Sequence, residues 1–290
     1  MSNDALYSSS EITKTYEQVH DLLLTRYIIK SYSTNKNDIR DVALAGTDLS
    51  KVKRVLELGC GYGFFIEKLK GMLHENAVII GIDMVENNRE PFLHSVASIQ
   101  YKGEFITAKA EIIKEMASES FDLIITSYSL YFFPYLMHEI ARILSTDGVY
   151  IAITHSENTL YEAIDIIKQC MKSIGLQIND DTVLHKLFYS FSLENGIHQL
   201  KKHFSKIEKI SYSNSIIFSY KNIKDCIFYI QKKKSLIYKE VIENMPDKIA
   251  EMEQCVEGKI IHAQHFRAMP AAAINRPGGD GATPLAAIPF

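Results

Sequence analysis

Length, composition and charge exclude several classes of protein at the outset. The chain has 290 residues, of which 47% are hydrophobic and 23% charged. This balance excludes disordered and fibrous proteins and suits one large or two small domains. The formal net charge of -3 gives no electrostatic reason to expect nucleic acid as the main ligand.

The cysteines and the apolar stretches indicate the cellular compartment. Cys60, Cys170, Cys226 and Cys255 are far apart, form no CxxC pair and have no histidine at zinc spacing. We therefore expect neither a disulfide framework nor a metal site. No apolar stretch approaches the roughly 20 residues of a membrane helix, and the N-terminus lacks the pattern of a targeting segment. A reducing cytoplasm fits these features best.

The first half of the chain changes from a helical pattern to an alternating one. Ser8 and Glu11 have the spacing of a capping box, and apolar residues then recur at helical spacing to about Ile29. Between residues 51 and 156, short apolar runs alternate with helix-like segments. The runs are 55–58, 78–82, 105–106, 123–126 and 149–154. This alternation predicts a parallel sheet covered by helices.

The second half is mainly helical. Residues 157–204 predict a helical insertion, and residues 236–267 a helical extension. Between these two segments, 205–235 contains two β-rich runs, Ile207 to Tyr212 and Ser215 to Tyr220. We expect the runs to pair as a hairpin and, with the helix after them, to complete the sheet as its antiparallel end.

Residues 268–290 differ in kind from the rest of the chain. They contain no lysine and are dominated by Ala, Pro and Gly. This composition predicts a disordered or extended tail. The composition of the tail differs from that of the rest of the chain, as it would if the tail were an artefact of the reading frame. We therefore exclude the tail from functional interpretation.

Three glycines at alternate positions follow the first predicted strand. Gly59, Gly61 and Gly63 come directly after the apolar run 55–58. Glycine permits a positive φ and the close approach of a ligand to the backbone. A tight turn whose glycines served only to pack the following helix would need one or two glycines, and this turn has three. The spacing lacks the third glycine of a dinucleotide fold and the Gly-Lys-Ser/Thr ending of a P-loop, so NAD and ATP are disfavoured.

The segment Glu57 to Gly63 closely resembles the E-x-G-x-G-x-G motif of class I S-adenosylmethionine-dependent methyltransferases. Asp83 at the end of the second strand, the fourth-strand segment 121–127 and the turn 144–150 match the same family in order and spacing. The resemblance covers residues 55–154. It continues more weakly into 191–196 and the hairpin, which are similar to small-molecule methyltransferases of the quinone-biosynthesis-like type, type 11.

This resemblance implies a fold. The expected architecture is α/β, with a Rossmann-like, seven-stranded, mostly parallel sheet that has an antiparallel end. The cofactor-binding core would span residues 51–156. A helical lid would be built from residues 1–50 and 157–204, and the active cleft would lie between the lid and the sheet.

The resemblance also implies the cofactor, S-adenosylmethionine, with S-adenosylhomocysteine as its product. The three glycines would give its methionine part access to the backbone, Glu57 would fix their loop through hydrogen bonds, and Asp83 would hold the ribose. Lys109 departs from the family, which often has an aspartate there to contact the adenine, and Glu111 also suits an ordinary acid in the first turn of a helix. The further residues expected at the cofactor are Tyr16, Cys60, Met84, Ala110, Glu111 and Ser127.

The acceptor side is indicated by residues that follow the fourth and fifth strands. Methyl transfer from a sulfonium is a direct displacement, so an enzyme mainly has to align the reactants. His155 is the candidate general base, because histidine is the usual choice near neutral pH. A loop histidine bonded to the backbone is the alternative interpretation. Tyr128 and Tyr131 are candidates to line the acceptor pocket, although such tyrosines are more often packing residues.

The sequence therefore predicts transfer of a methyl group to an O, N or C atom of a small organic acceptor. The motifs of base-modifying and metal-dependent catechol methyltransferases are missing, so we expect neither metal nor nucleic acid, and no membrane partner. Two alternatives stay open. One is a non-catalytic regulatory or scaffold protein that binds the cofactor; the other is an RNA methyltransferase, which should carry a basic stripe around the cleft. The sequence does not encode the oligomeric state.

Overall fold

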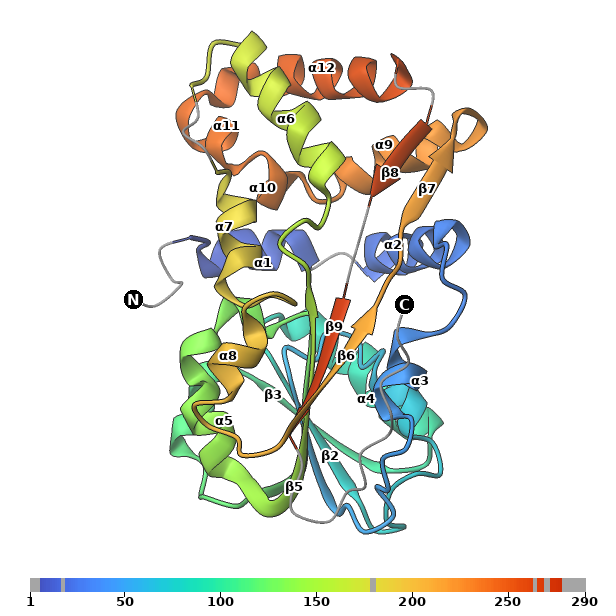
Figure 1. Ribbon diagram of the computed structural model, residues 1–290, viewed down its shortest axis with the longest axis vertical. Helices are drawn as coiled ribbons and strands as arrows, with labels where there is room; N and C mark the ends of the chain where they lie inside the picture. Colours follow the sequence, from blue (N-terminus) through green and yellow to red (C-terminus); the bar gives the residue numbers. More distant parts are fainter. Residues whose placement is uncertain (1–5, 17–18, 178–180, 263–264, 269–271, 278–290) are drawn as a thin grey trace.

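The apolar runs of the first half form the parallel part of a central sheet (Figure 1). The computed structural model describes residues 6–16, 19–177, 181–262, 265–268 and 272–277. Its sheet has the order β3-β2-β1-β4-β5-β9-β6, and the first five of these run parallel to one another. The predicted α/β fold with a mostly parallel sheet is thus confirmed. The parallel strands are β1 (Arg54–Leu58), β2 (Val78–Asp83), β3 (Lys102–Thr107), β4 (Phe121–Ser127) and β5 (Leu144–His155).

The inner strands β1, β2, β4 and β5 are largely buried on both faces because helices cover both faces, whereas the edge strand β3 is mostly exposed or half-buried. Successive side chains of a strand point in opposite directions, so Leu56 joins one core and its neighbour Val55 the other. The core that contains Leu56 also receives α5 (Met137–Ile143) and α8 (Gly196–Leu200). The core that contains Val55 receives α3 (Ile39–Leu44), the short helix η2 (Ile66–Leu69) and α4 (Arg89–Ser98).

The hairpin expected at the antiparallel end is not formed. β6 (Ile207–Tyr212) pairs with β9 (Ala272–Pro277), which is antiparallel to both β5 and β6. β7 (Ile216–Ser219) pairs instead with β8 (His265–Ala268) in a separate two-stranded sheet. The polar link between β6 and β7 does not reverse the chain because it is bonded elsewhere. The Thr34 N–H donates to the Ser215 carbonyl at 2.8 Å, and the Asn35 N–H to Asn214 Oδ1 at 3.0 Å.

The expectation of a disordered tail is wrong for part of that segment. Residues 272–277 form β9 inside the sheet, and they pair along their whole length with β6. A strand is held there by its backbone ladder, which an alanine-rich segment can provide as well as any other. The composition of the whole tail therefore misled the prediction. Residues 278–290 lie outside the described part of the chain.

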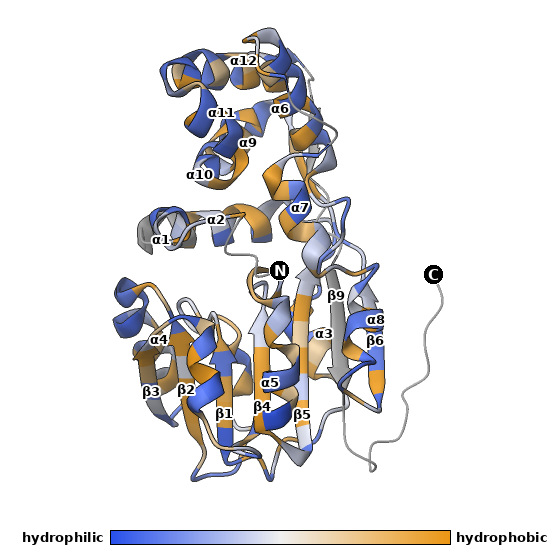
Figure 2. Cartoon of the chain, turned by 90° about the vertical axis from the view of Figure 1, so that its left-hand side faces the viewer, coloured by the Kyte–Doolittle hydropathy of each residue, from blue (hydrophilic) through white to orange (hydrophobic). Residues whose placement is uncertain are grey.

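A helical layer stands beyond the carboxyl ends of the parallel strands, and α1 (Ser9–Tyr16) and α2 (Val19–Tyr32) lie between it and the sheet (Figure 2). The capping box is confirmed, since the Ser8 N–H donates to Glu11 Oε2 at 2.7 Å and α1 follows. The expected insertion 157–204 contributes only part of the layer, because helices from 223–262 complete it. The layer consists of α6 (Tyr161–Ser173), α7 (Val183–Ser190), α9 (Ile223–Gln231), α10 (Lys234–Ile237), α11 (Lys239–Asn244) and α12 (Ile249–His262).

A disulfide bond joins Cys170 of α6 to Cys255 of α12, with their Cα atoms 5.7 Å apart. The expectation of unpaired cysteines is wrong for this pair, because the packing of α6 on α12 brings together residues 85 positions apart. Cys60 and Cys226 are free and buried. Disulfides are rare in reducing compartments, so the cysteines no longer support a cytoplasmic location. Within the described residues, no helix has the length and apolar character needed to cross a membrane.

Helix α2 contacts both the sheet layer and the helical layer. Towards the sheet, Arg26 pairs with Glu67 of η2 at 2.6 Å, and its guanidinium lies 4.2 Å from the centre of the Phe64 ring. Towards the helical layer, the Tyr32 hydroxyl donates to the Asp225 carboxylate of α9. The helix thereby links the segment that follows the three glycines to α9.

Candidate functional site

The three glycines of residues 59–63 have different surroundings. All three adopt a positive φ, of +67° at Gly59, +49° at Gly61 and +69° at Gly63. A Cβ atom on Gly59 would lie 2.5 Å from Ser129 Cβ, and one on Gly63 would lie 3.0 Å from Phe92 Cδ2. A Cβ on Gly61 would meet no atom within 4 Å. Two of the glycines therefore let the loop pack on its neighbours, and Gly61 alone faces open space.

Asp83 lies at the end of β2, directly beside this loop. Its Oδ2 accepts the Gly61 N–H at 2.8 Å, and its Oδ1 accepts the Val85 N–H at 2.9 Å. Burial raises the pKa of the carboxyl, while these backbone donors act in the opposite direction. Because each carboxylate oxygen can accept more than one hydrogen bond, Asp83 can still receive donors from a ligand.

Glu57 is buried at the end of β1 but does not fix the loop as expected. Its Oε2 has no hydrogen-bond partner among the described residues. Burial, and then the negative charge of Asp83, raise the pKa of Glu57 well above its ordinary value. The loop is held by other groups: the Gly59 N–H donates to the Ile82 carbonyl at 2.8 Å, and Ser129 Oγ to the Leu58 carbonyl at 2.6 Å. Sequence reasoning missed Ser129, which carries no motif signal of its own.

The other residues expected at the cofactor are distributed around this loop. Cys60 is buried, with Sγ only 2.7 Å from where a Cβ on Gly81 of β2 would lie, so its side chain packs against the sheet. Burial raises the pKa of this thiol. Ser127 ends β4, and Met84 follows Asp83; both are half-buried.

Two further candidates come from other elements. Ala110 and Glu111 begin the short helix η4 (Ala110–Glu115), where the Tyr135 hydroxyl donates to the Glu111 carboxylate. Tyr16 is the last residue of α1. Burial, and then the nearby Asp83 carboxylate, raise the pKa of Tyr16 to about 12. The fold thus brings an N-terminal tyrosine towards the carboxyl ends of the strands.

His155 ends β5 within a group of aromatic rings. Its ring centre lies 4.6 Å from that of Tyr128, 5.6 Å from that of Tyr131 and 4.8 Å from that of Phe188. Burial, and then the charge of Lys233, lower the pKa of the imidazole to about 3. Nδ1 has no hydrogen-bond partner among the described residues. His155 is therefore uncharged and weakly basic at neutral pH. Burial opposes protonation of the ring, and the role of His155 as a general base stays a prediction.

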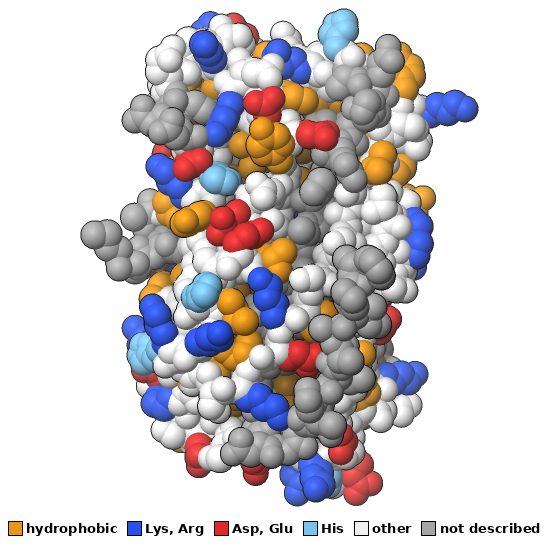
Figure 3. Space-filling view, in the orientation of Figure 1, with side chains coloured by type: hydrophobic (Ala, Val, Ile, Leu, Met, Phe, Trp, Pro, Cys, Tyr) orange, Lys and Arg blue, Asp and Glu red, His pale blue; other side chains and the backbone are white. Residues whose placement is uncertain are grey.

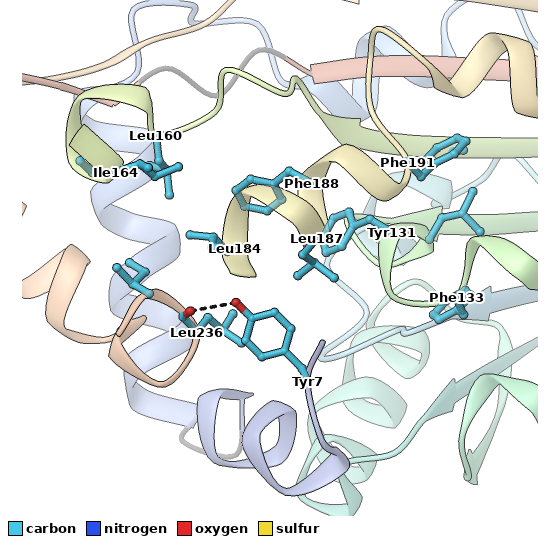
Figure 4. Close-up of a cluster of buried hydrophobic side chains, with 14 of the residues drawn as sticks. Tyr7, Tyr131, Phe133, Leu160, Ile164, Leu184, Leu187, Phe188, Phe191 and Leu236 are labelled. Atoms are coloured by element: carbon cyan, nitrogen blue, oxygen red, sulfur yellow. Dashed lines mark hydrogen bonds between the residues drawn. The ribbon is translucent and has the colours of Figure 1, made fainter. Parts of the chain in front are cut away.

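A pocket adjoins His155, and most of its lining comes from the helical layer. Figure 4 shows aromatic and leucine side chains turned towards a common space, from the loop after β4, from α7 and from α10. Tyr131 and Tyr16 line the pocket, whereas Tyr128 contacts His155 beside it. Sequence reasoning missed Phe188, Tyr229 and Lys233, because their segments show only the periodicity of ordinary helices. The lining includes Tyr16, Tyr131, His155, Phe188, Tyr229 and Lys233.

The charges around the site are mixed. On the face seen in Figure 3, acidic and basic side chains are interspersed. Among the described residues, no group of three or more His, Cys, Asp or Glu side chains is placed to hold a metal ion.

Comparison with known proteins gives a family and a fold. Residues 49–269 match the family model of a methyltransferase domain. No protein of curated function matches the chain. A cyclopropane synthase from Mycobacterium tuberculosis superimposes with a TM-score of 0.50 at 14% identity, over 93% of this chain and 98% of that one. A putative methyltransferase from Bacillus halodurans gives 0.50 at 11% identity, over 82% and 97%. At these identities the two structures share the fold with this chain.

Proposed function

This chain belongs to the methyltransferase-domain family, as the match over residues 49–269 shows, and we propose that it methylates a small organic acceptor without a metal ion. It is a class I methyltransferase that uses S-adenosylmethionine. The observation that carries the proposal is the open space at Gly61, next to the Asp83 carboxylate. Membership of the quinone-biosynthesis-like branch stays a prediction.

The residues at this position suit the cofactor. The backbone of the loop 59–63 would hold the methionine part, and Asp83 would accept the ribose hydroxyls. Glu57 has a buried carboxylate oxygen that lacks a partner and that a donor on the ligand would satisfy. The remaining neighbours would be Tyr16, Cys60 through its backbone, Met84, Ala110, Glu111 and Ser127. When bound, S-adenosylmethionine supplies a methyl group activated by its sulfonium, so the protein needs no nucleophile of its own.

The acceptor would occupy the pocket beside His155. Tyr131 and Phe188 exclude water from it and orient the bound molecule, and such alignment can contribute roughly 7 to 11 kcal/mol to catalysis. His155 would accept a hydrogen bond from the acceptor, because its imidazole is uncharged at neutral pH. The helical layer supplies α7, α9 and α10 to the lining, and we propose that it is the lid of the site.

Calorimetric titration with S-adenosylmethionine and S-adenosylhomocysteine tests the cofactor assignment, with NADH and ATP as controls. We expect micromolar binding of the two adenosyl compounds, about -8 kcal/mol, and no binding of the controls. Gly61→Arg should abolish this binding in a folded protein, because the new side chain would fill the open space.

Gly71→Arg is the matched control. Gly71 has a φ of +71° and, like Gly61, no atom within 4 Å of a Cβ, so the two substitutions impose the same backbone strain. We expect Gly71→Arg to bind the cofactor normally. Equal binding by both variants would remove the glycine loop from the cofactor site.

A further inference from the structure

Lys233 lines the acceptor pocket without a carboxylate to balance its charge. It lies between α9 and α10, and among the described residues no Asp or Glu forms an ion pair with it. Its Nζ lies 5.5 Å from the centre of the Tyr229 ring. Burial lowers the pKa of Lys233.

Lys239, a buried lysine of the same layer, shows what the half-buried Lys233 lacks. The side chain of Lys239 is only 8% exposed, and its Nζ pairs with Glu11 at 2.6 Å and with Glu243 at 2.7 Å. A buried ammonium group without such partners destabilises the folded chain. A cation over an aromatic ring regains only part of that free energy. The half-buried Lys233 thus leaves an ammonium group at the pocket that a negative group of a ligand could pair with.

Two more polar atoms of the pocket are unsatisfied. His155 Nδ1 and Thr159 Oγ1 are buried and have no hydrogen-bond partner in the described part of the chain, and both residues belong to the lining. Most of the remaining lining is apolar or aromatic, including Leu160, Leu184 and Phe188. A suitable ligand thus combines an apolar body with an anionic group and at least one further polar atom.

We propose that the methyl acceptor is a small organic acid whose anionic oxygen pairs with Lys233 and whose apolar part lies among the aromatic and leucine side chains of the pocket. This inference rests on the proposed function and names its substrate class. Lys233 is then the residue that selects acidic acceptors. A neutral acceptor would leave the ammonium unpaired, and a cationic one would be repelled.

Binding of matched acids and amides tests this inference. Phenylalkanoic acids of increasing chain length, and their amides, are titrated into the whole chain saturated with S-adenosylhomocysteine. The wild type should bind its best acid about ten- to a hundredfold more tightly than the corresponding amide, as a charge-assisted hydrogen bond predicts. Lys233→Met should abolish that preference. Lys233→Gln serves the same comparison if methionine disturbs folding.

Lys232→Met is the control, because Lys232 is exposed, lies over the Phe228 ring at 5.0 Å and does not line the pocket. It should keep the preference for acids. Three outcomes would overturn the inference: the wild type binds acids and amides with equal affinity, it binds no acid, or the preference for acids survives the loss of Lys233. S-adenosylhomocysteine is titrated alone into every variant. If the wild type fails to bind it, the proposed function fails; if it binds normally, the failure concerns the acceptor class only.

Discussion

The proposed cofactor side and the proposed acceptor side differ in how their polar groups are satisfied, although each keeps a buried atom without a partner among the described residues. On the cofactor side, the Asp83 carboxylate accepts backbone N–H groups of Gly61 and Val85. On the proposed acceptor side, the described residues give no hydrogen-bond partner to His155 Nδ1 or Thr159 Oγ1 and no ion-pair partner to Lys233. The Asp83 carboxylate is thus held in place by main-chain donors, whereas Glu57 Oε2 has no partner among the described residues. If the acceptor binds in this pocket as we propose, the unsatisfied atoms of the pocket are available to hydrogen-bond with it.

The largest expected effect would come from disturbing the packing of the glycine loop. Gly59→Ala places a Cβ 2.5 Å from Ser129 Cβ and retains a positive φ, so it should destabilise the chain by about 2 to 5 kcal/mol. Gly61→Ala imposes only the backbone strain, about 1 to 2 kcal/mol. Urea unfolding of both variants measures the difference. In a Ser129→Gly background, which also lacks the hydrogen bond to the Leu58 carbonyl, Gly59→Ala and Gly61→Ala should differ much less, and equal stabilities of the two single variants would contradict the packing argument.

The second-largest effect should come from the disulfide of the helical layer, and it should change stability without changing cofactor binding. Reduction of the Cys170–Cys255 bond should lower the free energy of unfolding by about 2 to 4 kcal/mol, because the bond closes a long loop in the unfolded chain. Affinity for S-adenosylmethionine should change little, since the cofactor side lies in the sheet layer. The measurement is denaturant unfolding with and without dithiothreitol. Cys255→Ala should not respond to the reductant, and a response equal to that of the wild type would exclude the bond as the cause.

A smaller effect should distinguish two similar carboxylates. Asp83→Asn should weaken binding of S-adenosylmethionine by about 1.5 to 3 kcal/mol, through the loss of charge-assisted hydrogen bonds. Asp122 also accepts two backbone N–H groups, from Lys53 at 2.8 Å and Arg54 at 3.0 Å, but at the opposite edge of the sheet. Asp122→Asn should therefore leave the affinity unchanged. Calorimetry that finds the same loss in both variants would assign the effect to general stability.

The smallest predicted effect is a loss of folding stability at acidic pH. His155 has a pKa of about 3 in the folded chain and an ordinary pKa of about 6.5 when unfolded, so the unfolded state binds the proton more readily. Stability is therefore lost as the pH falls from about 6.5 towards 3, and by pH 5 the loss is about 2 kcal/mol. Denaturant unfolding measures the free energy of unfolding at pH 7 and at pH 5. The loss between these two pH values should be smaller in His155→Phe than in the wild type. His138→Phe, which replaces an exposed histidine, should respond like the wild type.

The glycine loop and the position of Asp83 could be predicted from sequence because their determinants are local, whereas their roles in cofactor binding stay predictions. Gly59, Gly61 and Gly63 lie within five positions, and Asp83 follows from the one-strand, one-helix spacing of an alternating fold. The same reasoning assigned all three glycines to the close approach of a ligand, which overestimated how many of them a ligand requires. Two of the three glycines are required by contacts with Ser129 and Phe92, which come from other elements and leave no local pattern.

The acceptor side and the sheet's antiparallel end could not be predicted in this way. Phe188, Tyr229 and Lys233 come from separate helices, and only the packing of those helices places them around one pocket. Pairing of β6 with β9 joins segments about 65 residues apart, as the register Ile207 with Pro277 and Tyr212 with Ala272 shows. A hairpin inferred from neighbouring runs is the simplest local solution, and tertiary contacts of Asn214 override it.

The contacts of α2 restrict how a substrate can enter. This helix is tied to the sheet layer through Arg26 and Glu67 and to the helical layer through Tyr32 and Asp225. A rigid rotation of one layer away from the other would have to break one of these links. Small sliding movements of individual helices, a shear rather than a hinge, would leave both links intact.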